Sequence, residues 1–405
     1  MKETEMKFNA RHTIIACFTG IVVQALVINF SPLLFLTFEN ELGISLSKIS
    51  ALIAISFITQ LIMDFTASKL PCLFNNRASV ILSQLCSALG LICIAVLPSI
   101  MPPFPALVIA TVIAAFGSGI IEVMGNPIVE ACPVKNKNKI LSFMHSGYCW
   151  GLVLTVLLST LFFYFVGIEH WRLLSVLWAI IPALNALAFC FVPIYKINAE
   201  PTQRNGNRSA FHSFTFVAFF IIMLCAGAAE QAMSQWASSF AEMGLGVSKT
   251  VGDILGPCAF AVLMGIARII YARFSDRMDL SKFMLFSSTL CILSYSLAAL
   301  AQSPVAALIG CALCGFSVGI MWPGTLCMAN ENMNGGSVKM FALLALAGDM
   351  GCTLGPVTVG WIAEALGNDL KTALLSSIVF PVLMIIFIPF TTRKKQTSNN
   401  QTRKD

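Results

Sequence analysis

The chain has 405 residues, of which 57% are hydrophobic and 11% are charged, and its mean hydropathy is +0.83. Because soluble domains carry about 25% charged residues, this composition excludes a water-soluble globular protein and indicates one immersed in lipid. The net charge of +6 comes from clusters between the apolar segments and at the chain ends, so it does not indicate nucleic-acid binding.

Twelve apolar segments follow one another along the chain, each about 20 residues long, the length that crosses a bilayer as a helix. The first is too long for the apolar core of a signal peptide and lacks a small-residue cleavage site. We therefore predict an all-α membrane protein with twelve transmembrane helices. They lie near residues 12–38, 49–70, 78–98, 104–127, 140–166, 172–194, 211–240, 251–274, 283–301, 305–328, 340–365 and 371–391.

The basic residues are distributed unequally between the two sides of these spans. Twenty of the 25 Lys and Arg residues fall on the side that holds both chain ends, four fall on the other side, and Arg268 lies within a span. The positive-inside rule then places both termini in the cytoplasm. We expect a multi-pass protein of a bacterial inner membrane that functions as a monomer.

The two halves of the chain follow the same plan. The polar linker 195–210 separates an N-terminal bundle, 1–194, from a C-terminal bundle with a basic tail, 211–405. Two parallel six-helix repeats enclose a central cavity and give alternating access by rocking. The matches recur at an offset of about 200 residues and include Gly119 with Gly319, Lys139 with Lys339, and Gly151 with Gly351.

Ionisable side chains inside the spans are candidates for a functional site, because a charge in lipid is costly unless it faces a cavity or a partner. Glu122 is the strongest, since it lies in the middle of the fourth span with Asn126 one turn further on. Burial disfavours the charged form of a carboxyl group, so Glu122 is predicted to carry a proton reversibly. The alternative is a structural, hydrogen-bonded carboxyl group. The other candidates are Asp64, His145, Glu230, Arg268 and Asp349.

Polar side chains on the seventh span predict a binding face for a hydroxylated ligand. Amides and carboxylates bind sugar hydroxyls, and an indole ring packs on a sugar ring, whereas the alternative for each tryptophan is an anchor at the membrane interface. His145 could instead be a packing histidine. The predicted substrate-binding residues are Asn29, Asn126, His145, Trp150, Glu230, Gln231, Gln235, Trp236 and Trp322.

A third set is predicted to act in gating or between the bundles. Asp64 and Arg268 occupy equivalent positions in the two halves, so they either pair across the interface or bond within their own halves. Asp349 lies in a glycine-rich span that is expected to bend. Interfacial ion pairs of this kind stabilise little but can bias one conformation over another. The remaining members are Glu130, near Lys69 and Arg77, and Glu331, near Arg273 and the Asp276–Arg277 pair.

A degraded loop motif supports a family resemblance. Asp276 and Arg277 keep the Asp-Arg pair of the motif G-x-x-x-D-R-x-G-R-R, but Ala272 and Asp279 stand where glycines belong, and Ser68–Cys72 in the first half lacks the Asp. With its two six-span halves, the chain resembles the major facilitator superfamily over essentially its whole length.

Within that superfamily, three segments resemble fucose permease and related hexose–proton symporters: Glu122 with Asn126 and Pro127, His145 to Gly151, and Glu230 to Trp236. The resemblance implies proton-coupled uptake of a monosaccharide, with Glu122 as the protonation-linked residue. Fucose permease also has a functional aspartate in its first span, where this chain offers Gln24, Asn29 and Ser31. Glu122 then couples alone, or another group such as Asp64 assists, or the coupling is altered.

The leading hypothesis is a symporter of protons with a sugar or a similar small polar metabolite. The alternative is a drug or metabolite:proton antiporter, which the many Phe and Met residues keep open. An enzyme is not expected, because the chain has no HExxH helix, no Walker loop and no clustered His/Asp set. The CxxC formed by Cys311 and Cys314 lies inside a span without a second pair, so no metal and no cofactor is expected.

Overall fold

The computed structural model describes residues 9–69, 76–134, 137–195, 214–274, 279–332 and 338–391. Every regular element in these ranges is a helix, and twelve helical segments are long and apolar enough to cross a membrane. The prediction of an all-α fold with twelve spans is therefore confirmed. The predicted linker, 195–210, lies outside the described residues except for Tyr195.

The first six spans form the N-terminal bundle. Its first span changes from α-helix to a 3₁₀ turn at Ser31, because Pro32 lacks the backbone N–H that a continuous helix needs there. The elements are α1 Ala10–Phe30, η1 Ser31–Leu34, α2 Phe35–Leu42, α3 Leu46–Lys69, α4 Asn76–Val96, η3 Leu97–Ser99, α5 Pro103–Ala131, α6 Lys137–Val166, η4 Ile168–His170 and α7 Trp171–Phe191.

The last six spans form the C-terminal bundle, in which several spans are interrupted. A π-helical turn contains Pro257 in the eighth span, and the tenth span is divided between two helices at Gly319. The elements are α8 Phe214–Ser239, η6 Phe240–Gly244, α9 Lys249–Asp253, η7 Ile254–Cys258, α10 Ala259–Phe274, α11 Leu280–Leu300, α12 Pro304–Val318, α13 Met321–Asn332, α14 Val338–Ala365, α15 Leu370–Ser376 and α16 Val379–Thr391.

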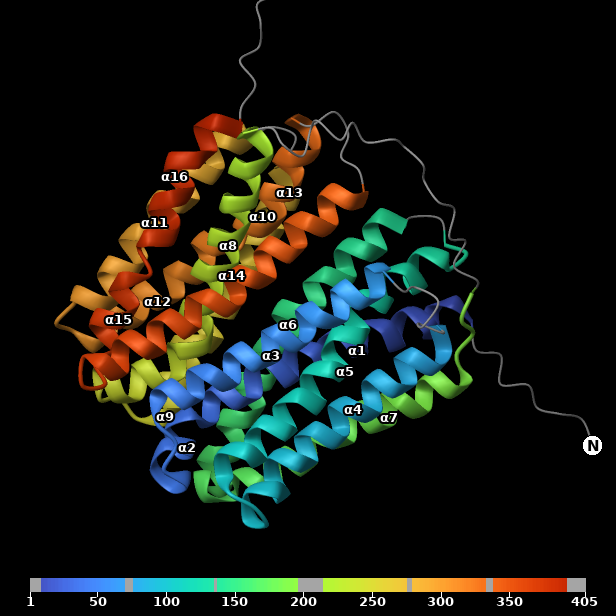
Figure 1. The fold of residues 1–405 in the computed structure, drawn as a ribbon, viewed down its shortest axis with the longest axis horizontal. Coiled ribbons are helices and arrows are strands. Elements are labelled where there is room, and N and C mark those ends of the chain that lie inside the picture. The colour runs from blue at the N-terminus through green and yellow to red at the C-terminus, as the bar shows by residue number, and fades with distance from the viewer. Residues whose placement is uncertain are drawn as a thin grey trace, which may run out of the picture.

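The two bundles meet along two pairs of spans. Helix α3 packs on α14, and α6 packs on the span formed by α9, η7 and α10. Figure 1 shows α14 running beside α3 between the C-terminal helices and the N-terminal helices. The site lies between these contacts, so its walls come from both halves of the chain.

Polar contacts between the bundles gather at one end of the molecule, the end opposite to Ala10. The Glu364 carboxylate accepts from the Ser47 amide, and the Asn368 amide donates to Glu39 over 3.1 Å. Lys249 adds a third bridge, because its Nζ donates to the Leu33 carbonyl over 2.7 Å. We call this region, where residues 33–50 meet residues 236–253 and 356–369, the closed end.

Close helix packing fixes the cavity-lining helices of the C-terminal bundle. A Cβ at Gly351 on α14 would overlap the Leu224 carbonyl oxygen, and one at Gly355 would overlap that of Ala228. Small residues let two helix backbones approach in this way, and the direct van der Waals contact stabilises their packing in lipid. The approach holds α14 against α8, and Asp349 and Glu230 therefore sit on two firmly packed helices.

Candidate functional site

A cavity of about 240 Å³ lies between the bundles and is lined by both of them. Most of its polar side chains are carboxyl groups and amides, with one guanidinium group, and its apolar wall is formed mainly by α1 and α3. The lining residues are Ile21, Gln24, Ile28, Phe57, Gln60, Glu122, Asn126 and Tyr148 from the N-terminal half, and Glu230, Gln231, Arg268, Trp322, Asp349 and Cys352 from the C-terminal half.

Glu122 is held in the N-terminal wall of the cavity by one strong contact. The Gln24 amide donates from Nε2 to Glu122 Oε2 over 2.7 Å. Because the amide hydrogen-bonds either the protonated or the ionised carboxyl group, Glu122 can change its charge without losing its position. No Lys or Arg side chain among the described residues forms an ion pair with Glu122.

A pair of carboxyl groups bridges the two bundles near Glu122. Asp64 on α3 and Asp349 on α14 lie close enough to share a side-chain hydrogen bond. Two ionised carboxylates have no hydrogen to share, so this bond forms only when the pair holds a proton. Asp349, Asp64 and Glu122 are near enough to interact electrostatically, and Glu230 and Cys352 are further titratable groups in the cavity wall.

The cation of the cavity is paired within its own bundle. Arg268 Nη2 lies 3.8 Å from Glu230 Oε2, and Arg268 Nε donates to the Gly319 carbonyl over 3.1 Å. The Gln231 amide reaches the other oxygen of Glu230 at 3.5 Å. Arg268 thus pairs with Glu230 and Asp64 with Asp349, which differs from the Asp64–Arg268 pair considered from the sequence.

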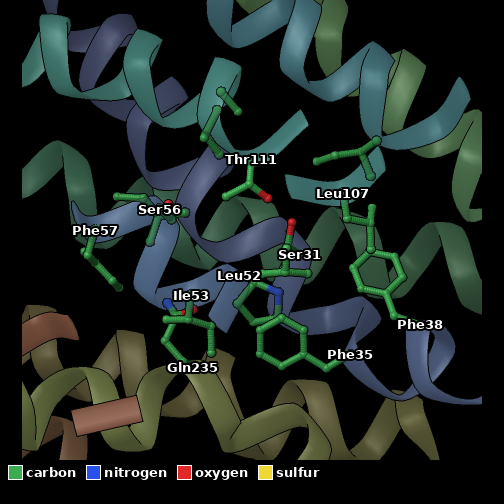
Figure 2. A pocket seen from close by; sticks show the side chains of 15 residues that line it. Ser31, Phe35, Phe38, Leu52, Ile53, Ser56, Phe57, Leu107, Thr111 and Gln235 are labelled. Carbon is green, nitrogen blue, oxygen red and sulfur yellow. The ribbon is translucent and has the colours of Figure 1, made fainter. Parts of the chain in front are cut away.

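A second, smaller pocket of about 40 Å³ adjoins the cavity on the side of the closed end, since Ile28 and Phe57 line both. Figure 2 shows Ser31, Ser56 and Thr111 around it, with Phe35 of α2 beside the α8 side chain Gln235, which forms the wall from the C-terminal half. Gln235 donates to Gln231 over 3.1 Å. The predicted binding face of α8 is therefore divided between two adjoining pockets.

Three residues predicted to bind substrate have other surroundings. Trp236 is fully buried, donates to the Pro356 carbonyl over 2.9 Å, and packs on Phe35 with ring centroids 5.4 Å apart, so it seals the closed end. Asn29 is bound to the Ala25 carbonyl and to Tyr148. Trp150 is 42% exposed and shares its helix face with the exposed Leu154 and Leu158, so it points away from the cavity.

The residues predicted to form ion pairs at the end of the bundles that holds Ala10 do not show these pairs among the described residues. Glu130 and Glu331 are exposed, and Arg77 donates to the carbonyls of Phe189, Cys190 and Val192 rather than to Glu130. Asp276, Arg277 and the side chain of His145 lie outside the described residues.

The cavity also contains polar residues that were not predicted as site residues: Gln24, Gln60 and Tyr148. Each is a hydrogen-bonding side chain inside an apolar segment, which is the signal that could have identified them. The prediction gave weight to ionisable groups and to tryptophans, and although it included Asn29 it passed over Gln24 and Gln60 in the first two spans.

Comparisons with known proteins agree with this geometry. A sequence model of the Major Facilitator Superfamily matches residues 16–265 and 255–405. The structure is similar to the fucose:proton symporter FucP of E. coli, with a TM-score of 0.63, 17% identity, and coverage of 94% of this chain and 98% of that one. No curated protein sequence matches the chain.

Two further solved structures resemble the chain at similarly low identity. A D-xylose–proton symporter gives a TM-score of 0.70 with 13% identity. A bacterial homologue of the human lysosomal transporter Spinster, in an inward-facing and occupied conformation, gives 0.72 with 14% identity. Both comparisons cover 94% of this chain and 96% of the other. At such identities the likeness establishes the fold.

Proposed function

The chain belongs to the Major Facilitator Superfamily of membrane transporters, and we propose that it moves a monosaccharide or a similar small polar metabolite together with a proton. The observation that carries this proposal is Glu122, a carboxyl group in the wall of a cavity between the bundles that is held by Gln24 at 2.7 Å. The cavity volume of about 240 Å³ suits a single sugar ring with a few waters.

The polar lining supports a hydroxylated substrate. Gln231, Asn126 and Tyr148 offer donors and acceptors, and Trp322 offers an aromatic face for the apolar side of a ring. Glu122 accepts the proton, and its neutralisation removes a buried charge that would otherwise oppose movement of the N-terminal bundle. Substrate and proton then cross together as the bundles rock.

The orientation belongs to the same proposal. With both termini in the cytoplasm of a bacterial cell, as the distribution of Lys and Arg predicts, the closed end faces the outside. The structure then corresponds to a conformation whose outer end is sealed, in which the site exchanges substrate with the cytoplasm.

The proposal is tested by replacing Glu122 with Gln in protein reconstituted into vesicles. We expect the variant to lose sugar accumulation driven by a pH gradient, because an amide cannot carry the proton, but to keep part of the sugar exchange measured without a gradient. Glu130→Gln is the matched control, since Glu130 lies on the same helix and is exposed. Gradient-driven accumulation by Glu122→Gln at the wild-type level would contradict the coupling role.

The second candidate is a drug or metabolite:proton antiporter. The apolar cavity wall of Ile21, Ile28 and Phe57 favours it, since such a wall suits a ligand with a hydrophobic body. The sign of the pH change distinguishes the two functions. Substrate entering a vesicle acidifies the lumen during symport and makes it alkaline during antiport, which a trapped pH-sensitive dye reports.

A further inference from the structure

Gln60 on α3 carries a buried amide group in the wall of the cavity. Its side chain is 4% exposed, lines the central cavity, and finds no hydrogen-bond acceptor for Nε2 among the described residues. An unpaired amide donor in such a place costs about 1–3 kcal/mol. Native structures rarely keep such groups, and each one requires an explanation.

The surrounding helices do not let Gln60 withdraw from the cavity. A Cβ on Gly119 of α5 would lie 3.3 Å from the Gln60 Cα, so the two backbones touch. On the other side α3 packs against α14 of the opposite bundle. The helix position is therefore fixed, and Gln60 stays in the wall of the cavity.

The charges around Gln60 decide which acceptor fits. Asp64 lies four residues further along α3 and so on the same face, and Glu122 and Asp349 line the cavity. The Asp64–Asp349 pair keeps one negative charge while it shares a proton, and this charge disfavours an anion beside Gln60. Arg268 does not offset it, because it is already engaged by Glu230 and the Gly319 carbonyl.

We infer that the unpaired Gln60 amide, set among Asp64, Glu122 and Asp349, donates a hydrogen bond to an uncharged oxygen of the substrate and selects a neutral hydroxylated ligand over its carboxylate analogue. This inference rests on the proposed function and extends it in two ways. It adds a contact from α3, the helix at the interface with the other bundle, and it excludes sugar acids from the substrate class.

The test uses the full-length purified protein and the probes D-glucose, D-xylose, L-fucose and D-glucuronate. We expect at least one neutral sugar to raise the Tm of the wild type and D-glucuronate to leave it unchanged. Gln60→Leu removes the amide at similar volume, so its Tm without sugar stays equal or rises, while its Kd for the same sugar increases at least ten-fold. Gln60→Asn, whose amide is one methylene shorter, gives an intermediate Kd.

The matched control is Gln84→Leu. Gln84 is equally buried in the N-terminal bundle, but its amide is paired with Ser83 and Asn185 and does not line the cavity. This variant should lose Tm without sugar and keep its Kd. A Gln60→Leu protein that loses Tm as Gln84→Leu does, or that binds sugar with the wild-type Kd, would overturn the inference.

The outcomes of these measurements distinguish a failure of this inference from a failure of the proposed function on which it rests. A wild type that responds to none of the sugars contradicts the proposed function. A wild type that responds, together with a Gln60→Leu variant that responds equally, contradicts the inference alone. Tighter binding of D-glucuronate than of D-glucose contradicts the assignment of an uncharged ligand.

Discussion

Arg268 and Glu230 form an ion pair in the wall of the cavity between the bundles, and the pairing offsets part of the free-energy cost of burying each charge. Each is accompanied by neutral groups, the Gly319 carbonyl for Arg268 and the Gln231 amide for Glu230. At 3.8 Å the two charges contact weakly, but both are largely buried, with 26% and 10% of their side chains exposed. Removing one charge from such a pair leaves the other without compensation, which costs more than the pair contributes.

We therefore expect Arg268→Met to destabilise the protein by about 1–3 kcal/mol, because the Glu230 carboxylate loses its cation. The double variant Glu230→Gln with Arg268→Met should recover much of this loss, since no charge is then left unpaired. Thermal unfolding of the two single variants and the double variant in the same detergent measures the coupling. A double variant less stable than Arg268→Met would contradict the pairing.

At the scale of elements, the packing of α14 on α8 positions the C-terminal wall of the cavity. Gly351 and Gly355 meet the backbone of α8 directly, one turn apart on the same face of α14. Asp349 and Cys352 lie beside them and line the cavity. A change in the distance between these two helices therefore reaches the site, although neither glycine touches the cavity.

Gly351→Ala should lower the Tm by several degrees, because the new methyl group overlaps the Leu224 carbonyl oxygen and the rigid backbones cannot separate without loss of packing. Gly265→Ala on α10 is the matched control. Its Cβ would have an ordinary contact with Cys149 at 3.8 Å, so better helix propensity should leave the Tm equal or higher. Equal Tm changes in the two variants would show that the close approach contributes nothing.

For the whole molecule, the closed end decides which side of the cavity is sealed. Lys249 contacts Glu242 at 2.9 Å and Asp253 at 3.3 Å, and it also donates to the Leu33 carbonyl of the opposite bundle. Asp253 is fully buried and accepts from Thr160 across the interface. The Asp64–Asp349 contact adds a bridge nearer the site, which holds while the pair keeps a proton.

Lys249→Met should shift the population towards a conformation with this end open, because the Asp253 carboxylate is then buried without its cation. Hydrogen–deuterium exchange measures the shift as faster exchange in α2, Phe35–Leu42, and in α9, Lys249–Asp253. The control is Lys282→Met, whose charge is exposed and pairs only with Asp279 among the described residues. Unchanged exchange in Lys249→Met would show that this network does not hold the end closed.

The sequence by itself determined the twelve spans, since the length and composition of an apolar segment decide whether it crosses a bilayer. It also singled out polar residues within the spans that line the cavity: Glu122, Asn126, Glu230, Gln231 and Trp322, which were predicted to act at the site, and Arg268 and Asp349, which were predicted to act in gating or between the bundles. Polar groups inside a span avoid lipid, so their presence alone predicts an inward position.

Only the tertiary structure decided which charged residues pair with one another and in which direction each tryptophan points. Trp236 seals the closed end and Trp150 faces outward, although both are tryptophans within apolar spans of the sequence. Lipid and the protein core are equally apolar, so the sequence of an apolar helix does not reveal which face contacts lipid and which packs against other helices. The pairing of Arg268 with Glu230, and of Asp64 with Asp349, depends on distances between helices that are remote from each other in the chain.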